Sequence, residues 1–220
     1  MSSIEVSSLS KSFQSVSGKR LILDNVSIQI QTEIPTIFYG PSGSGKTTLL
    51  QIIGGLISPD EGKITAFDKI VYPHQQNGSF EIKKQISWVP QNIQLFDELK
   101  ISENIDIFGK GRNYSSQLID ILCDKFGISE LLDYYPSRLS MGEKQRVAIV
   151  RSIVSNSKLL IFDEPTSAMD KINSQQFIEI LKDNKIVTDK IILIATHDYI
   201  FFNNNFVIYK FENGKLLAQN

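Results

Sequence analysis

Residues 40–47 read Gly-Pro-Ser-Gly-Ser-Gly-Lys-Thr and match in full the Gly-x-x-x-x-Gly-Lys-Ser/Thr pattern of loops that hold nucleotide phosphates. An apolar run at 35–39 precedes the loop and a helical stretch follows it, which is the context that the pattern requires. The internal glycines allow successive N–H groups to turn towards one anion, and the helix start adds its dipole. We expect Lys46 to reach the β- and γ-phosphates and the Thr47 hydroxyl to bind Mg²⁺. The predicted nucleotide-binding residues here are Gly40, Pro41, Ser42, Gly43, Ser44, Gly45, Lys46, Thr47 and Thr48.

A second candidate site lies at the end of the apolar run 159–162, where Asp163 and Glu164 precede Pro165. Carboxylates that follow a buried parallel strand face the crevice in which α/β sheets bind ligands. Asp163 fits the aspartate on the Mg²⁺ side of phosphate-loop NTPases. Glu164 is expected to point to the other side of the strand, where it would polarise an attacking water as a general base.

The elements that must position these residues follow from the apolar pattern. Short apolar runs predict buried strands at 35–39, 85–90, 159–162 and 191–196. Further strands are expected at 3–13, 21–31, 62–71 and 206–217, with a polar loop after residue 13 that runs to Gly18. Helices are expected at 46–54 and 143–155, and residues 92–157 read mostly helical. Buried strands that alternate with helices imply a parallel α/β sheet.

Composition narrows the class of protein further. The chain has 220 residues, of which 41% are hydrophobic and 21% charged, and its net charge is -1. This balance gives no global electrostatic reason to bind nucleic acid. The single cysteine, Cys123, excludes an internal disulfide, and the two histidines, His74 and His197, show no zinc-ligand spacing. No apolar run approaches the ~20 residues that a membrane span needs.

Five further motifs resemble those of the ABC-transporter nucleotide-binding domain, in the order that the family has them and over essentially the whole chain. Residues 139–146 read Leu-Ser-Met-Gly-Glu-Lys-Gln-Arg and resemble the family signature, usually written LSGGQ or LSGGE. The other four are the Q-loop glutamine Gln91, the D-loop 167–170, the switch histidine His197 and the A-loop aromatic Phe13. The signature is similar to that of the compact lipoprotein-release, macrolide-export and peptide-export ATPases.

The resemblance implies one domain, 1–220, with the fold of a RecA-like P-loop NTPase. Its ATP-binding core would comprise 1–91 and 158–220, with a parallel sheet and an N-terminal antiparallel β subdomain. Residues 92–157 would form an inserted helical subdomain that carries the signature.

The resemblance also implies site roles. Phe13 would stack on adenine. Gln91 would contact Mg²⁺ or the attacking water, and His197 would hold the γ-phosphate and orient the water with Glu164. Each has a plainer interpretation as a strand-edge, loop or structural residue, and Asp170 reads equally as a helix N-terminal acid or an interface residue.

Dimerisation is the main consequence of the signature. Its nucleotide-binding residues would be Ser140, Gly142 and Glu143, which would face the γ-phosphate of an ATP held by a second ATPase subunit, identical or different. Met141 stands where the family has glycine; we expect it to be tolerated, although a Met side chain resists positive φ.

The resemblance implies an ATPase at the cytoplasmic face of the membrane, with ATP and Mg²⁺ as cofactors and separate transmembrane permease subunits as partners. Segment 92–110 would receive the membrane subunit, and similarity to export-type subunits implies export.

Two alternatives stay open here: a soluble ABC-type ATPase of translation or DNA repair, and a regulatory module that binds nucleotide without hydrolysis. The single domain, the lack of heptads and the net charge of -1 disfavour the first. The intact phosphate-loop and acidic residues, together with His197, disfavour the second.

Overall fold

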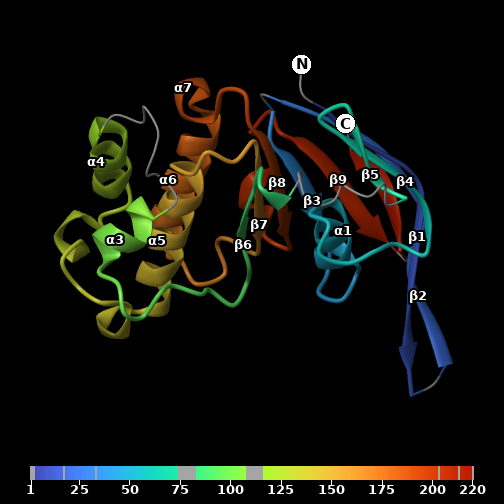
Figure 1. Ribbon diagram of the computed structural model, residues 1–220, viewed down its shortest axis with the longest axis horizontal. Coiled ribbons are helices and arrows are strands. Elements are labelled where there is room, and N and C mark those ends of the chain that lie inside the picture. The colour runs from blue at the N-terminus through green and yellow to red at the C-terminus, as the bar shows by residue number, and fades with distance from the viewer. Residues whose placement is uncertain are drawn as a thin grey trace.

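The computed structural model describes residues 3–16, 18–32, 34–73, 83–107, 116–202, 204–212 and 214–219. A six-stranded sheet forms the centre of the molecule, with strand order β10-β9-β3-β8-β7-β6 (Figure 1). Neighbouring strands are parallel from β9 to β6, and only the β9–β10 edge hairpin is antiparallel. The strands are β3 (Thr36–Tyr39), β6 (Ile86–Val89), β7 (Leu159–Asp163), β8 (Ile191–Thr196), β9 (Val207–Glu212) and β10 (Lys215–Gln219). This confirms the predicted parallel core.

A second, antiparallel sheet of four strands packs beside the core, in the order β2-β1-β4-β5. Its strands are β1 (Ser3–Ser15), β2 (Gly18–Gln31), β4 (Glu61–Ala66) and β5 (Lys69–Tyr72). The ends of β1 and β2 leave the body of the protein as a long hairpin arm (Figure 1). The expected polar loop from residue 13 to 18 is therefore wrong, because the two strands stay paired as far as Ser15 and Gly18.

Helices cover the core sheet and build a lobe at the end of the molecule away from the hairpin arm (Figure 1). They are α1 (Lys46–Ile53), α3 (Ile101–Asp106), α4 (Ser116–Lys125), α5 (Met141–Ile153), α6 (Lys171–Lys182) and α7 (Asn184–Val187), with 3₁₀ turns at 129–131, 136–138 and 199–201. The lobe contains α3, α4 and part of α5. Within the described ranges, no helix has both the length and the apolar character needed to cross a bilayer.

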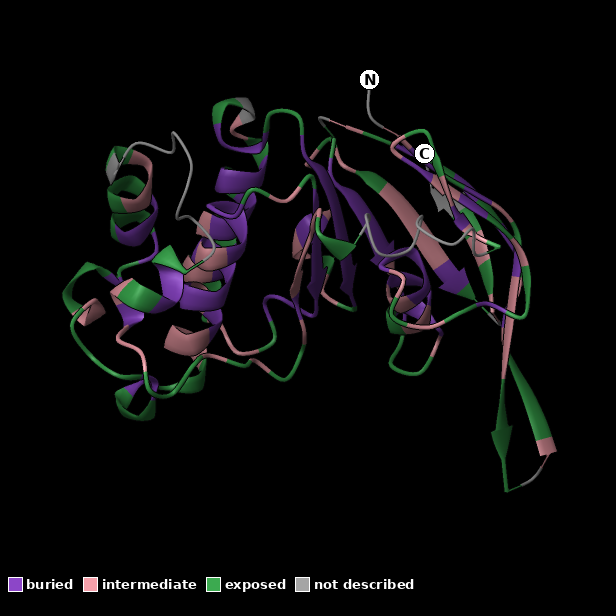
Figure 2. Ribbon diagram, in the orientation of Figure 1, coloured by how far each residue is buried: buried purple, intermediate pink, exposed green. Residues whose placement is uncertain are grey.

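Each central strand serves two hydrophobic cores. Along β7, Leu160 and Phe162 pack with the helices of the lobe, whereas Leu159 and Ile161 pack with α1 and the antiparallel sheet. This follows from the alternation of side chains along a strand and explains why these runs are continuously apolar. Figure 2 shows the result: the central strands are buried throughout, and the end of the hairpin arm is exposed.

Two expected helical boundaries differ from the structure. Helix α5 begins at Met141, two residues before the expected start, because Ser140 and Glu143 form a reciprocal capping box. Segment 92–100 is not helical. The buried Asn104 side chain stabilises it instead, since its amide donates to the carbonyls of Phe96 and Leu99 at 3.0 and 3.1 Å.

Candidate functional site

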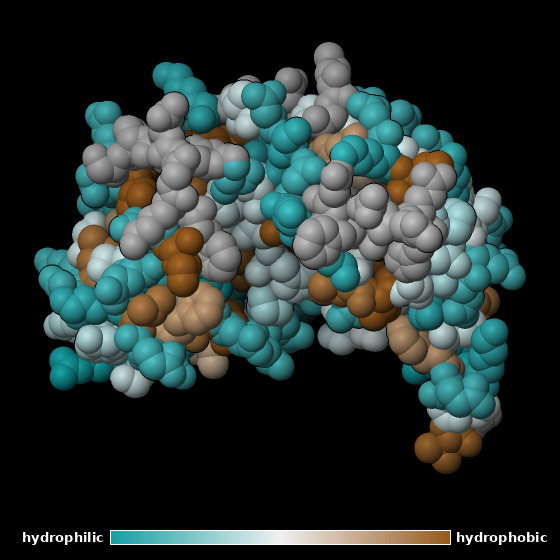
Figure 3. Space-filling view, in the orientation of Figure 1, coloured by the Kyte–Doolittle hydropathy of each residue, from teal (hydrophilic) through white to brown (hydrophobic). Residues whose placement is uncertain are grey.

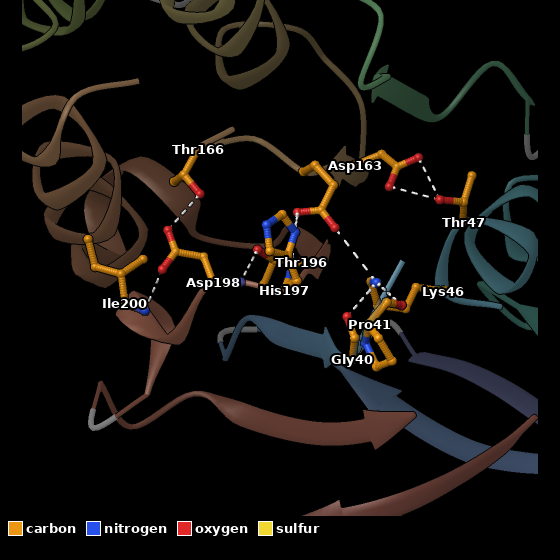
Figure 4. Close-up of polar contacts among 11 residues, drawn as sticks. Gly40, Pro41, Lys46, Thr47, Asp163, Thr166, Thr196, His197, Asp198 and Ile200 are labelled. Carbon is orange, nitrogen blue, oxygen red and sulfur yellow. Dashed lines mark hydrogen bonds and ion pairs between the residues drawn. The ribbon is translucent and has the colours of Figure 1, made fainter. Parts of the chain in front are cut away.

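Lys46 binds back to the first two residues of the phosphate loop. Lys46 is the first residue of α1, and its Nζ donates to the carbonyl oxygens of Gly40 at 2.7 Å and Pro41 at 3.0 Å (Figure 4). The same ammonium lies 3.7 Å from Oε1 of Glu164. Burial lowers the pKa of Lys46, and the carboxylates of Glu164 and Asp163 oppose that shift. The loop thus holds a buried cation in the place where the sequence predicts phosphate binding.

Thr47 and Asp163 meet across the edge of the sheet. The Thr47 hydroxyl lies 3.0 and 2.9 Å from the two carboxylate oxygens of Asp163, although 116 residues separate them (Figure 4). Burial raises the pKa of Asp163, and the hydroxyl of Thr47 opposes the shift. A hydroxyl and a carboxylate are the oxygen ligands that Mg²⁺ prefers. The described part of the chain has no group of three or more His, Cys, Asp or Glu that would enclose a metal.

Glu164 points away from its neighbour Asp163. Its φ is 51°, in the left-handed region that non-glycine residues rarely adopt, and its N–H donates to the Ala195 carbonyl at 2.8 Å. This turn sends its carboxylate to His197, whose Nδ1 and backbone N lie 2.9 and 3.3 Å from Oε2 (Figure 4). The two consecutive acids therefore face different partners, as the sequence predicted.

Hydrogen bonds of Asp198 hold the backbone just after His197. Asp198 accepts hydrogen bonds from the Thr166 hydroxyl at 3.1 Å and from the Ile200 N–H at 3.0 Å (Figure 4). The His197 side chain itself is 59% exposed. Its ring is therefore open to a ligand while its Nδ1 is engaged by Glu164.

One cavity of about 310 Å³ joins the sites that the sequence placed separately. Its volume is within the range of small-molecule sites. The lining residues are Phe13, Arg20, Ile22, Ser42, Gly43, Gly45, Lys46, Thr47, Thr48, Gln91, Glu164 and His197. Arg20 and Ile22 were missed by sequence reasoning. Arg20 lies opposite Phe13 in the β1–β2 hairpin. The residues around Arg20 carry no motif that would show this pairing in the sequence.

The signature residues lie outside this cavity lining. Ser140 is the N-cap of α5: its Oγ accepts the Glu143 N–H at 3.3 Å, and the Glu143 carboxylate accepts the Ser140 N–H at 2.7 Å. The Ser140 hydroxyl also donates to the Glu143 carboxylate, at 2.7 Å, and this bond together with the one from the Ser140 N–H lowers the pKa of Glu143. Met141 is 59% exposed and is the first residue of α5, and its φ is not among the positive ones, so the reservation about positive φ does not apply; that Met141 is tolerated in the signature stays a prediction. Ser140, Gly142 and Glu143 therefore do not line the cavity beside the phosphate loop of their own chain, and their expected contact with an ATP held by a second subunit stays a prediction.

Gly142 has a steric requirement of its own. A Cβ atom there would lie 2.6 Å from the carbonyl oxygen of Ala168, in the segment that follows the acidic pair. We expect Gly142→Ala to lower the free energy of unfolding by about 1–3 kcal/mol, because the helix start and the 167–170 segment must move apart. Urea denaturation would measure this.

The matched control for Gly142→Ala is Met141→Ala, one residue away and largely exposed. It should leave the unfolding midpoint nearly unchanged. An unchanged midpoint for Gly142→Ala would show that the contact with Ala168 is not tight.

Asp170 acts in this structure as the N-cap of α6. Its Oδ1 accepts the Asn173 N–H at 2.8 Å, and these Asn173 contacts lower the pKa of its carboxyl. Within the single chain, Asp170 is therefore the acid at the N-terminus of a helix, which is one of the two interpretations that the sequence offered. His74 lies outside the described residues, and Cys123 is buried.

Comparison with known proteins agrees with this geometry. The family model described as ABC transporter matches residues 23–167. HrtA of Staphylococcus epidermidis, an ATP-binding protein named for hemin import, is 31% identical over 215 residues, which is 96% of this chain and 97% of the relative. LolD of Saccharophagus degradans, the ATP-binding protein of a lipoprotein-releasing system, is 32% identical over 203 residues, covering 90% of this chain and 89% of its own.

Solved structures match along nearly the whole chain. The dimeric structure of MJ0796, a bacterial ABC transporter cassette, superposes with a TM-score of 0.85 at 25% identity and covers 99% of this chain and 98% of its own. The same cassette solved in a post-hydrolysis state, with ADP and phosphate bound, has the same score, identity and coverage. These relatives favour the transporter ATPase over a translation or repair factor and over a module that does not hydrolyse. The chain belongs to the ABC transporter family, as an ATP-binding subunit that hydrolyses ATP.

Proposed function

We propose that the two consecutive carboxylates divide the work of ATP hydrolysis. Asp163 and Thr47 would hold Mg²⁺, which neutralises phosphate charge when bound. Glu164 would accept a proton from the attacking water, with His197 fixing its orientation through Nδ1 and leaving Nε2 for the γ-phosphate. The observation that carries this proposal is the left-handed turn at Glu164, which separates two adjacent acids into two environments.

Other residues would surround the bound ATP. The phosphate loop, Gly40 to Thr48, would hold the phosphates through its N–H groups and Lys46. Phe13 would stack on adenine, and Gln91 would approach the Mg²⁺ side or the water. Both line the same cavity as the phosphate loop, which supports these assignments.

A complete site would need two chains. Ser140, Gly142 and Glu143 would meet the γ-phosphate of the ATP held by a partner ATPase, identical or related. Support comes from their absence from the lining of the cavity in their own chain and from the dimeric form of the MJ0796 cassette.

Residues 92–157 would form the lobe that communicates with transmembrane permease subunits, the core being 1–91 and 158–220. The described part of segment 92–110, residues 92–107, exposes Phe96 and Ile107, and Figure 3 shows apolar side chains gathered on this lobe. The chain would then lie at the cytoplasmic face of the membrane. The relatives are named for both import and release, so export rests on the resemblance to compact export-type subunits alone.

Purification from membranes of the host tests the transporter assembly. The tagged protein, extracted in mild detergent, should carry a stoichiometric multi-spanning subunit identifiable by mass spectrometry. Phe96→Ser should reduce the amount recovered, whereas Leu217→Ser, an exposed apolar residue on β10, should not. Recovery only with ribosomal or repair proteins would contradict the proposal.

Removal of Mg²⁺ or of its proposed ligand should stop turnover. We expect excess EDTA to abolish phosphate release and Asp163→Asn to raise the Mg²⁺ concentration needed for half-maximal activity by about tenfold or more, since a neutral amide is a weaker ligand. Activity titrated against free Mg²⁺ measures this. An Asp170→Asn variant should keep the wild-type Mg²⁺ dependence, and equal behaviour of the two variants would contradict the assignment.

A further inference from the structure

An acidic side chain from another part of the chain holds the strand that carries Phe13. Asp60 lies between α1 and β4, about fifty residues away. Its Oδ1 lies 2.9 Å from Nζ of Lys11, and its Oδ2 accepts the N–H of Ser12 at 2.8 Å. Its own N–H donates to the carbonyl of Ser10 at 2.9 Å. Three consecutive residues of β1 are thus bound by this one residue.

The contact lies where β1 loses one of its neighbours. Pairing between β1 and β4 ends at Ser10 with Glu61, and beyond it, among the strands that the structure describes, β1 pairs with β2 alone. The β1–β2 register is also irregular on both sides of Lys11. Such irregularities leave strands bent and backbone groups without ladder partners. At the base of the hairpin arm, just before Phe13, Asp60 therefore supplies hydrogen bonds to the β1 backbone in place of a neighbouring strand.

The Lys11 side chain that Asp60 binds also lies against the Phe13 ring. The Lys11 ammonium lies 5.4 Å from the centre of this ring, within the distance of a favourable cation–π interaction. Phe13 lines the cavity beside the phosphate loop, and Lys11 does not. The ring is thus in contact with an ammonium held by Asp60 and also lines the space available to a ligand. The hydrogen bond from Lys11 lowers the pKa of Asp60, which agrees with a charged carboxylate at neutral pH.

We propose that Asp60 is a positioning residue for the nucleobase: through Lys11 and Ser12 it holds the Phe13 ring against the cavity so that a purine stacks on its open face. The inference rests on the proposed function, in which Phe13 binds the base of ATP. Asp60 does not itself line the cavity, so any effect of Asp60 on ATP binding must act through β1, the strand that carries Phe13.

The test compares Asp60→Ala with Glu61→Ala, which removes the same charge from the next, exposed residue. Asp60→Ala should raise the KM for ATP about three- to tenfold, the size of one aromatic stacking or cation–π contact, and leave kcat within twofold. Glu61→Ala should change neither. Asp60→Asn keeps an acceptor for the Ser12 N–H but not the charge facing Lys11, so its KM for ATP should lie between those of the other two variants. This variant still tests the inference if Asp60→Ala folds poorly.

A ligand without a base separates positioning from general damage. Inorganic tripolyphosphate, used as a competitor of ATP, should inhibit wild type and Asp60→Ala with the same inhibition constant, because it cannot reach Phe13. An equal loss for tripolyphosphate, or an unchanged KM for ATP, would overturn the inference.

Phe13→Ala separates this inference from the proposed function. If Phe13→Ala raises the KM and Asp60→Ala added to it raises it no further, the two residues act together as proposed. If Phe13→Ala raises the KM and Asp60→Ala alone does not, only the inference about Asp60 is wrong. If Phe13→Ala changes nothing, the proposed base stacking is wrong as well.

Discussion

Glu164→Gln is expected to lower the rate of ATP hydrolysis by roughly 100- to 1,000-fold while ATP still binds, because general-base catalysis contributes a factor of this size. The amide keeps the shape of the side chain and an oxygen for the His197 backbone N–H. It cannot accept a proton from water. The defect should therefore appear in kcat, with the Kd for ATP close to that of the wild type.

Phosphate release and equilibrium ATP binding, measured on the same preparation, check this expectation. Glu179→Gln, an exposed acid on α6 paired with Lys182, is the matched control and should retain full activity. Because the blocked variant retains ATP, it should also accumulate as a dimer with ATP and Mg²⁺ in light scattering. A monomer at saturating ATP would argue against a homodimer and in favour of pairing with a different ATPase. Near-normal turnover would mean that another group activates the water.

Lys46→Ala is expected to act at the earlier step, binding. The Lys46 ammonium donates to the carbonyls of Gly40 and Pro41 and lies 3.7 Å from Oε1 of Glu164. Its removal leaves the loop carbonyls without this donor and takes away the charge that would meet the phosphates. Hydrogen bonds to charged groups contribute about 1.5–3 kcal/mol each, so we expect ATP affinity to fall about 100-fold or more.

Isothermal titration with ATP measures the loss, with Lys171→Ala as the control that removes an exposed lysine at the start of α6. The control should bind ATP as the wild type does. If Lys46→Ala bound ATP with wild-type affinity and failed only in turnover, the lysine would serve the transition state rather than the ground state.

Much of the fold was predictable because continuous signals in the sequence specify it. The runs at 159–162 and 191–196 are apolar on both faces, and only a strand between two cores requires that. The polar end of the β1–β2 hairpin was predicted as a loop for the same physical reason. An arm that projects from the body has no core to face and therefore no apolar alternation.

The candidate site was predictable where one local segment carries the chemistry. The phosphate loop and the acidic pair are each contiguous, and the parallel sheet brings their ends together, so the Thr47–Asp163 contact follows from the fold. The contact of Gly142 with the Ala168 carbonyl and that of Asp60 with Lys11 join segments through tertiary packing. No periodicity or spacing in the chain encodes such contacts, and they appear only in the structure.

The separation of the signature residues from the cavity of their own chain has a genetic consequence. In the proposed pair, each site combines the phosphate loop of one chain with the signature of the other. Two damaged alleles, one altered at Lys46 and one at Gly142, would then complement partially, because each mixed pair regains one intact site. A single allele altered at both positions would instead be dominant over the wild type, since it spoils both sites of every pair that it enters.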